Sequence, residues 1–153
     1  MRKFFLFFVV LTLMVLCQCK STSLQEEEKM VNIAGNWNIQ ITFTSNSCSE
    51  SLPDDDTMLI SIIQNDTILS GSTEDGDVIS GTIDKDGNFN ISFEGDKTIS
   101  TEGGDMKIHY KVEIKGKADN ETTLKGTGKS HMTGDNNTDC ILEFNFVAEK
   151  IIN

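Results

Sequence analysis

The chain contains 153 residues, of which 24 are acidic and 13 are basic, and its net charge is −11 at pH 7. A chain of this length has room for one domain. An acidic surface of this kind repels phosphate backbones, so we expect no nucleic-acid partner.

The N-terminal segment has the pattern of a secretory signal peptide. Arg2 and Lys3 are followed by an apolar run over residues 4–16 that only Thr12 interrupts. The run is shorter than the about 20 residues that a membrane span requires, but it fits the apolar core of a signal peptide. We therefore expect residues 1–18 to direct export. Their removal would leave 11 basic and 24 acidic residues and a net charge of −13.

The segment Leu16-Cys17-Gln18-Cys19, directly after the apolar run, resembles the bacterial lipobox. In a lipobox a Leu lies three residues before the Cys that receives diacylglycerol, and a small residue normally precedes that Cys; Gln18 stands there instead. The resemblance implies a lipoprotein held in a membrane through Cys19, or through Cys17 as the alternative, in the cell envelope or at the cell surface. Cleavage nearby without lipidation would instead give a free secreted protein.

Residues 19–33 are polar with an acidic run and are predicted to be a flexible tether. From 34 to 153 the pattern changes and predicts a single domain. Trp37, Ile39 and Ile41 alternate with polar residues, which is typical of a strand with one buried face, and the same period of two returns later in the chain. The predicted strands are roughly 35–44, 57–64, 67–72, 77–83, 88–93, 98–116 (interrupted at Gly103-Gly104), 122–130 and 140–149.

Short turns rich in Asn, Asp and Gly separate several of these strands. Consecutive antiparallel strands with short links predict an all-β, up-and-down meander that closes, or nearly closes, into a barrel without exposed edges. Glycines within the predicted strands suit a sheet that must bend sharply. They are Gly71, Gly81, Gly126 and Gly128.

Cys48 and Cys140 are the cysteines beyond the signal region. No Cys-x-x-Cys or Cys/His cluster that would indicate zinc accompanies them. In an exported domain such a pair predicts a disulfide. The strand order agrees with this pairing, because Cys48 follows the first strand and Cys140 begins the eighth, and these strands are neighbours in a closed barrel.

The up-and-down order also sorts the connections between strands. The long ones, predicted at 45–56, 73–76, 94–105 and 131–139, gather at the disulfide end, whereas the tight turns gather where the tether arrives. Binding functions tend to lie on long loops held by a rigid scaffold, so we expect a partner at this end, which points away from the membrane. The acidic residues predicted there are Glu50, Asp54, Asp55, Asp56, Glu74, Asp75, Asp105, Asp135 and Asp139.

Gly35-Asn36-Trp37 on the first predicted strand resembles the Gly-x-Trp that opens lipocalin-like barrels, and the order of short meander strands is similar over roughly residues 34–149. Other lipocalin landmarks, such as the Thr-Asp-Tyr segment and the C-terminal helix, are not visible. The resemblance implies a lipocalin-like fold and a ligand cavity, with Trp37 closing one end of the barrel. It implies no particular ligand.

Inward-facing aromatic residues could line such a cavity for a small apolar ligand. The candidates are Trp37, Phe43, Phe89, Tyr110 and Phe144. The same rings could equally fill an eight-stranded barrel as a core, and we favour the filled core because bulky side chains dominate the inward set.

No residues in the sequence predict catalysis, a metal site or a cofactor. His131 with Asp135 and Asp139 is the one local grouping of ionisable side chains that could act on a metal or a proton, and it lacks further converging partners. We therefore expect a non-catalytic binding module that takes a small apolar ligand or a protein partner. The alternative is an inhibitor of a secreted hydrolase such as a protease or lysozyme, because small periplasmic barrels of that kind resemble this outline.

Overall fold

The computed structural model describes residues 30–48, 55–101, 104–134 and 138–152. These residues form eight β-strands: β1 (Gly35–Asn46), β2 (Asp55–Asn65), β3 (Ile68–Thr73), β4 (Val78–Ile83), β5 (Asn88–Thr101), β6 (Gly104–Asn120), β7 (Thr123–Gly134) and β8 (Thr138–Lys150). Across the same residues, no helix is long and apolar enough to span a membrane.

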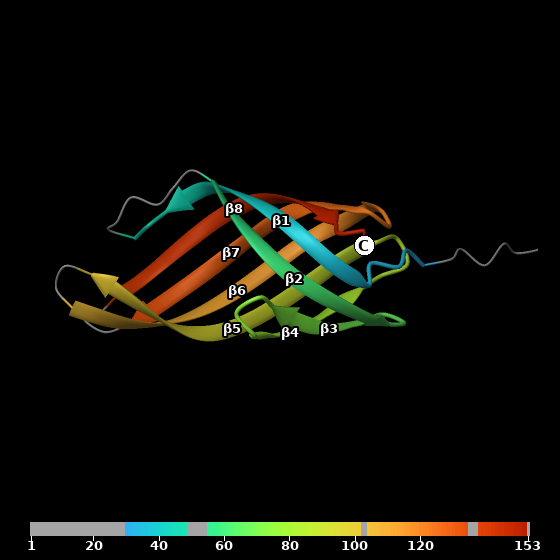
Figure 1. The fold of residues 1–153 in the computed structure, drawn as a ribbon. Coiled ribbons are helices and arrows are strands. Elements are labelled where there is room, and N and C mark those ends of the chain that lie inside the picture. Colours follow the sequence, from blue (N-terminus) through green and yellow to red (C-terminus); the bar gives the residue numbers. More distant parts are fainter. Residues whose placement is uncertain (1–29, 49–54, 102–103, 135–137, 153) are drawn as a thin grey trace, which may run out of the picture.

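Each strand pairs antiparallel with the next one in the chain, and β8 pairs with β1, so the sheet closes on itself (Figure 1). Trp37 pairs with Lys150 at one end of the β1–β8 seam, and Asn46 pairs with Leu142 at the other. The predicted all-β, up-and-down barrel of eight strands is thus confirmed. Period-two alternation predicted it correctly because one face of every strand is buried.

Two of the predicted long loops are wrong. β5 continues to Thr101 and β6 begins at Gly104, so residues 94–101 and 104–105 of the predicted loop are strand. The described residues of the predicted strand 98–116 belong to two strands that pair with each other. Likewise, β7 runs to Gly134 and β8 starts at Thr138, which makes most of 131–139 strand. These polar stretches lack apolar alternation, but backbone ladder bonds with a neighbouring strand hold them in β-structure all the same.

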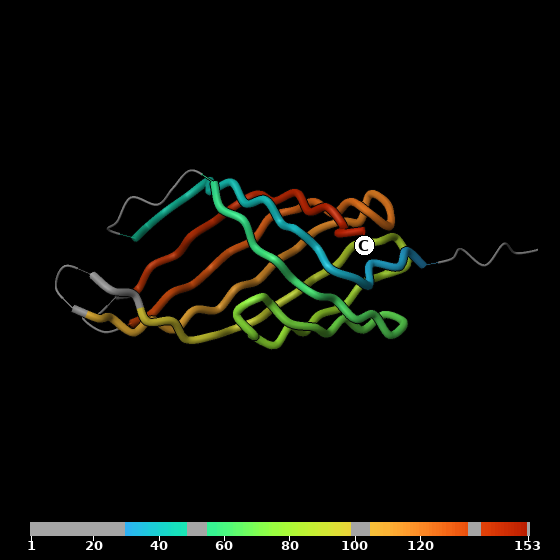
Figure 2. The backbone as a smooth tube through the Cα atoms, in the orientation of Figure 1, coloured from blue at the N-terminus to red at the C-terminus, as the bar shows by residue number. Residues whose placement is uncertain are grey.

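The strands differ in length around the ring. β3 and β4 each have 6 residues, whereas β5 to β8 have between 12 and 17. The long strands therefore extend past the short ones at the end of the barrel opposite the one where the chain arrives (Figure 2). We call the end where residue 30 arrives the proximal end and the end that carries the disulfide the distal end.

The proximal end is closed by the chain itself. Ile33 and Trp37 are fully buried, and the Trp37 indole N–H donates a 2.9 Å hydrogen bond to the Ile33 carbonyl. The Gln64 side chain accepts from the Ile33 amide and donates to the Val31 carbonyl. Met30 also packs on the core. The folded unit therefore includes Met30 to Ile33, four residues that the sequence assigned to the tether, and residues 19–29 lie outside the described part.

The predicted disulfide is confirmed at the distal end. Cys48 and Cys140 are bonded, with their Cα atoms 5.0 Å apart. Cys48 follows β1 and Cys140 lies on β8, and the Ser47 amide donates to the Ile141 carbonyl beside the bridge. The bridge thus fastens the seam that closes the barrel.

Candidate functional site

The side chains predicted to bind an apolar ligand belong to one continuous hydrophobic core. Trp37, Phe89 and Phe144 are buried, and Phe43 and Tyr110 are half-buried against the same cluster nearer the distal end. The rings of Phe43 and Phe144 meet edge to face, with their centroids 6.3 Å apart, an arrangement that aromatic pairs favour. The structure therefore gives these residues a packing role.

Glycines on β6 and β7 leave space for the rings that fill the barrel. A Cβ atom placed on Gly116 would lie 2.6 Å from Cζ of Phe89, and one placed on Gly128 would overlap the ring of Phe144. At both positions an aromatic ring rests directly on backbone. The middle of the barrel is therefore occupied by protein atoms at the positions where a ligand would meet Phe89 and Phe144.

The connection between β3 and β4 is linked to β6 by a hydrogen bond. The Tyr110 hydroxyl on β6 donates a 2.6 Å hydrogen bond to Asp77, and Asp77 in turn bonds with the buried Thr73. Gly95 on β5 leaves room for this group, because a Cβ there would lie 2.7 Å from the Tyr110 oxygen. The pKa of Tyr110 is raised above its usual value, mainly by burial and secondly by the hydrogen bond to Asp77. This contact holds the short strands against β6.

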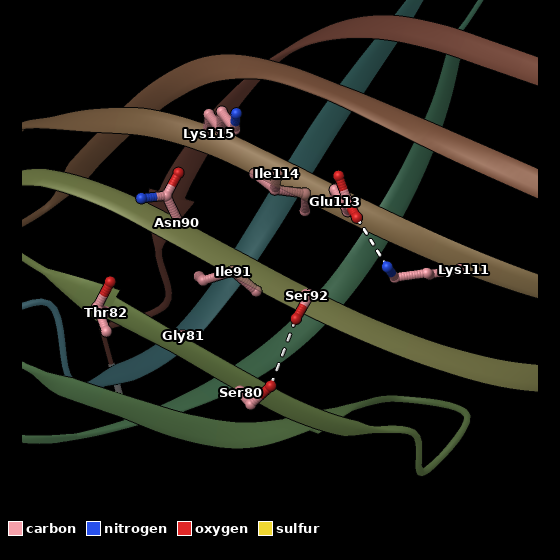
Figure 3. Close-up of a pocket in the computed structure, with 10 residues that line it drawn as sticks. All are labelled: Ser80, Gly81, Thr82, Asn90, Ile91, Ser92, Lys111, Glu113, Ile114 and Lys115. Carbon is pink, nitrogen blue, oxygen red and sulfur yellow. Dashed lines mark hydrogen bonds and ion pairs between the residues drawn. The ribbon is translucent and has the colours of Figure 1, made fainter.

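Open grooves lie on the outside of the barrel. One groove of about 590 Å³ runs along the outer surface of β4, β5 and β6 (Figure 3). A second, of about 390 Å³, lies on the other side of β6, over β7 and β8. Glu113 and Lys115 on β6 border both grooves. Outward side chains of β6 therefore stand where the two grooves meet.

Outward lysines are concentrated on β6 and β7, and we call this surface the lysine face. It consists of Lys107, Lys111, Lys115, Lys117, Lys125 and Lys129, all exposed. Strand register places Glu113 opposite Lys129, and Lys117 opposite Lys125.

Glu113 is the acidic centre of this surface. Its carboxylate accepts a 2.8 Å ion-paired hydrogen bond from Lys111, as the dashed line in Figure 3 shows. That hydrogen bond, aided by the charges of Lys111, Lys115 and Lys129, lowers the pKa of Glu113 below its usual value. The hydrogen bond to Glu113 also raises the pKa of Lys111. Lys129 is directly opposite both Glu113 and Glu143, whereas Lys115 is opposite the neutral Asn90 and Thr127.

Each of the two histidines lies on the outer surface and contacts one carboxylate. His131 Nε2 lies 2.7 Å from Asp139, and His109 Nδ1 lies 3.1 Å from Asp96. Asp135, the third member of the predicted grouping, falls outside the described residues. Among the residues that are described, no three His, Cys, Asp or Glu side chains come together to hold a metal ion.

The acidic residues predicted at the distal end divide into two groups. Asp55 and Asp56 begin β2, Glu74 and Asp75 lie in the β3–β4 connection, and all four are exposed. Asp105 and Asp139 lie on strands rather than on loops. Glu50, Asp54 and Asp135 lie outside the described residues.

Comparison with known proteins adds no relative. No family of proteins matches this chain, and no curated protein or solved structure matches it either.

Sequence reasoning missed the lysine face, although a signal for it exists. The alternation of Lys107, Lys111 and Lys115 along one strand is visible in the sequence. Lysines on β7 join them only through the β6–β7 register, which the turn at 121–122 sets. The contact between Tyr110 and Asp77 spans 33 residues and has no local signal at all.

Proposed function

We propose that this chain is an exported, lipid-anchored, non-catalytic binding module that recognises its partner with the outer surface of the barrel. The signal-like residues 1–18 and the lipobox-like Cys19, with Cys17 as the alternative, support the address. Because the described chain begins at the proximal end, a lipid at Cys19 would tether that end. The sides and the distal end would then stand free for a partner.

The observation that carries this proposal is the contrast between the inside and the outside of the barrel. The ring of Phe144 packs on Gly128, and that of Phe89 packs on Gly116. The grooves border Glu113 and Lys115, which are exposed. This arrangement favours a partner on the surface over a small apolar ligand inside. The lipocalin-like Gly35-Asn36-Trp37 supports the architecture and no particular ligand.

Native mass spectrometry of the full chain, extracted in mild detergent from its own membrane, tests this proposal. We expect a mass that corresponds to residues 19–153 with a diacylglycerol group, an intact Cys48–Cys140 bridge and no retained small molecule. A chain that carries no lipid would contradict the anchor. An apolar compound retained in stoichiometric amount would contradict recognition by the surface alone.

A second candidate function is inhibition of a secreted hydrolase. The observation that favours it is the β5–β6 hairpin, which pairs as far as Thr101 and Gly104 and extends past the short strands at the distal end. An ordered segment of this kind could enter the cleft of a hydrolase. The predicted long loops at 45–56 and 131–139, which could also enter such a cleft, lie partly outside the described residues. Capture assays with purified secreted proteases and lysozyme test this candidate, and failure to bind any of them would contradict it.

A further inference from the structure

The lysine face is a local excess of cations on an acidic molecule. Outside the signal-like segment the chain has 24 acidic residues and 11 lysines. Six of those lysines point outward from two adjacent strands, at Lys107, Lys111, Lys115, Lys117, Lys125 and Lys129. A surface shaped only by solubility has no need to gather its few cations on one pair of strands.

The register of β6 and β7 sets cations against each other. Lys117 is directly opposite Lys125. Like charges directly opposite one another destabilise a sheet, whereas opposite charges stabilise it. Asp119 offsets the charge of Lys125 at 2.8 Å, and Glu113 offsets that of Lys111. Lys129 is directly opposite Glu113 and Glu143, whereas Lys115 is opposite the neutral Asn90 and Thr127. An anion from outside the chain can therefore bind Lys115.

Neutral hydrogen-bonding side chains surround Lys115. Across the barrel from β5 to β8, Asn90, Lys115, Thr127 and Asn145 are paired in register and form one exposed row. Asn90 and Lys115 border one groove (Figure 3), and Lys115, Thr127 and Asn145 border the other. Amide and hydroxyl groups beside a lysine can bind the hydroxyls of a sugar ring while the lysine binds an acidic substituent.

We propose that the lysine face binds an anionic polysaccharide, a chain in which hydroxyl-bearing sugar rings separate carboxylate or sulfate groups. The proposal rests on the proposed function and names the partner of its outer surface. Lys115 and Lys129 bind the acidic groups, and Asn90, Thr127 and Asn145 bind hydroxyls along the grooves. Because successive outward residues on a strand are about 7 Å apart, Lys115 and Lys117 can meet acidic groups that are spaced along a sugar chain.

Charge and composition favour this partner over three others. Glu113 and Glu143 lie on either side of Lys129 in the row next to Lys115. They repel polyanions of high charge density such as nucleic acids, so a less densely charged sugar chain fits this surface better. Stable protein interfaces are rich in aromatic, Met and Arg side chains and poor in Lys, and the row through Lys115 has none of the favoured types. A helix or sheet face that rests on a bilayer also inserts apolar side chains, and this row contains none.

The test compares two variants of the full-length chain in detergent that lose the same amount of charge. Lys115→Gln/Lys129→Gln alters the lysine face. Lys85→Gln/Lys97→Gln is the control, because both of its lysines are exposed and lie outside that face. The probes are alginate as a carboxylated chain, heparin as a sulfated chain, dextran as a neutral chain, polyglutamate, and vesicles of phosphatidylglycerol with phosphatidylcholine. Tryptophan fluorescence checks that both variants fold.

We expect wild type to bind alginate, to bind the more densely charged heparin less tightly, to ignore dextran, and to bind less tightly as salt is added. The lysine-face variant should bind at least about tenfold more weakly, because each lysine lost removes a charged hydrogen bond. The control variant should bind like wild type. Equal loss in both variants, binding only to polyglutamate or vesicles, or binding to none of the probes would each overturn this inference. The proposed function would survive such a result if native mass spectrometry still shows a lipidated chain without a retained ligand.

Discussion

On β6, β7 and β8, the side chains that point into the barrel differ from those that point out. Ile114 and Phe144 are buried and point inward, and Gly128 has no side chain because the ring of Phe144 fills its place. Their neighbours Glu113 and Asn145 are exposed and point outward. Adjacent residues on one strand therefore differ in role: the inner ones pack the core, and we propose that the outer ones serve recognition.

The largest expected effect comes from emptying the inner face. Phe144→Ala removes a buried ring that packs on both Phe43 and Gly128. Such truncations cost about 3–5 kcal/mol. The neighbouring outward change Asn145→Ala should alter the free energy of unfolding by less than about 0.5 kcal/mol. Urea unfolding followed by circular dichroism measures both, and similar losses in the two variants would mean that the strand faces are assigned wrongly.

Overfilling the inner face should have a smaller effect. Gly128→Ala places a methyl group against the Phe144 ring, and overpacking of this kind costs about 1–3 kcal/mol. The outward change Thr127→Ala on the same strand is the matched control and should be close to neutral. A Gly128→Ala variant as stable as wild type would indicate free space inside the barrel, and would revive an interior ligand.

The hydrogen bond between Tyr110 and Asp77 should affect how the free energy of unfolding depends on pH in the alkaline range. The chain has one tyrosine, so ultraviolet absorbance reports Tyr110 alone. Its pKa should lie above the usual 10.0 in the folded protein, because burial and the bond to Asp77 disfavour the tyrosinate. Above that pH the unfolded chain loses the proton first, so rising pH lowers the free energy of unfolding.

Two variants test this hydrogen bond. Asp77→Asn should bring the pKa of Tyr110 closer to 10.0. Tyr110→Phe should remove the part of the stability loss above about pH 10 that is due to the tyrosine. If Asp77→Asn leaves the tyrosine titration unchanged, Asp77 does not hold the ring in solution.

The smallest expected effect on stability is that of the outer lysines. Lys115→Gln/Lys129→Gln removes one lysine opposite neutral residues and one opposite Glu113 and Glu143. Because these side chains are exposed, the free energy of unfolding in urea should fall by no more than about 1 kcal/mol. The same variant is expected to lose polysaccharide binding. A large loss of stability would show that the lysines support the fold rather than a partner.

The sequence predicted the fold well where apolar side chains alternate. Trp37, Ile39 and Ile41 mark β1 because one face of that strand is buried. The β5–β6 hairpin near Thr101 and Gly104 escaped prediction because backbone pairing, and not alternation, holds it. The disulfide could be predicted since chain order alone makes β1 and β8 neighbours.

The candidate site was harder to predict, because it depends on which side chains face each other across strands. The aromatic set was correctly placed inside, but whether Phe144 lines a cavity or fills it depends on Gly128 opposite, which register alone decides. Lys115 and Lys129 come together on the outer surface for the same reason. Patterns within one segment carry no such information.

The central claim is that this barrel recognises its partner with its outer face. Titration of the isotope-labelled full chain with alginate oligosaccharides, followed by amide and indole chemical shifts, tests it most directly. We expect the largest changes at Lys115, Thr127 and Lys129, with the buried Trp37 indole unchanged. Changes concentrated at Trp37 and Phe144 would contradict the claim and place the ligand inside the barrel.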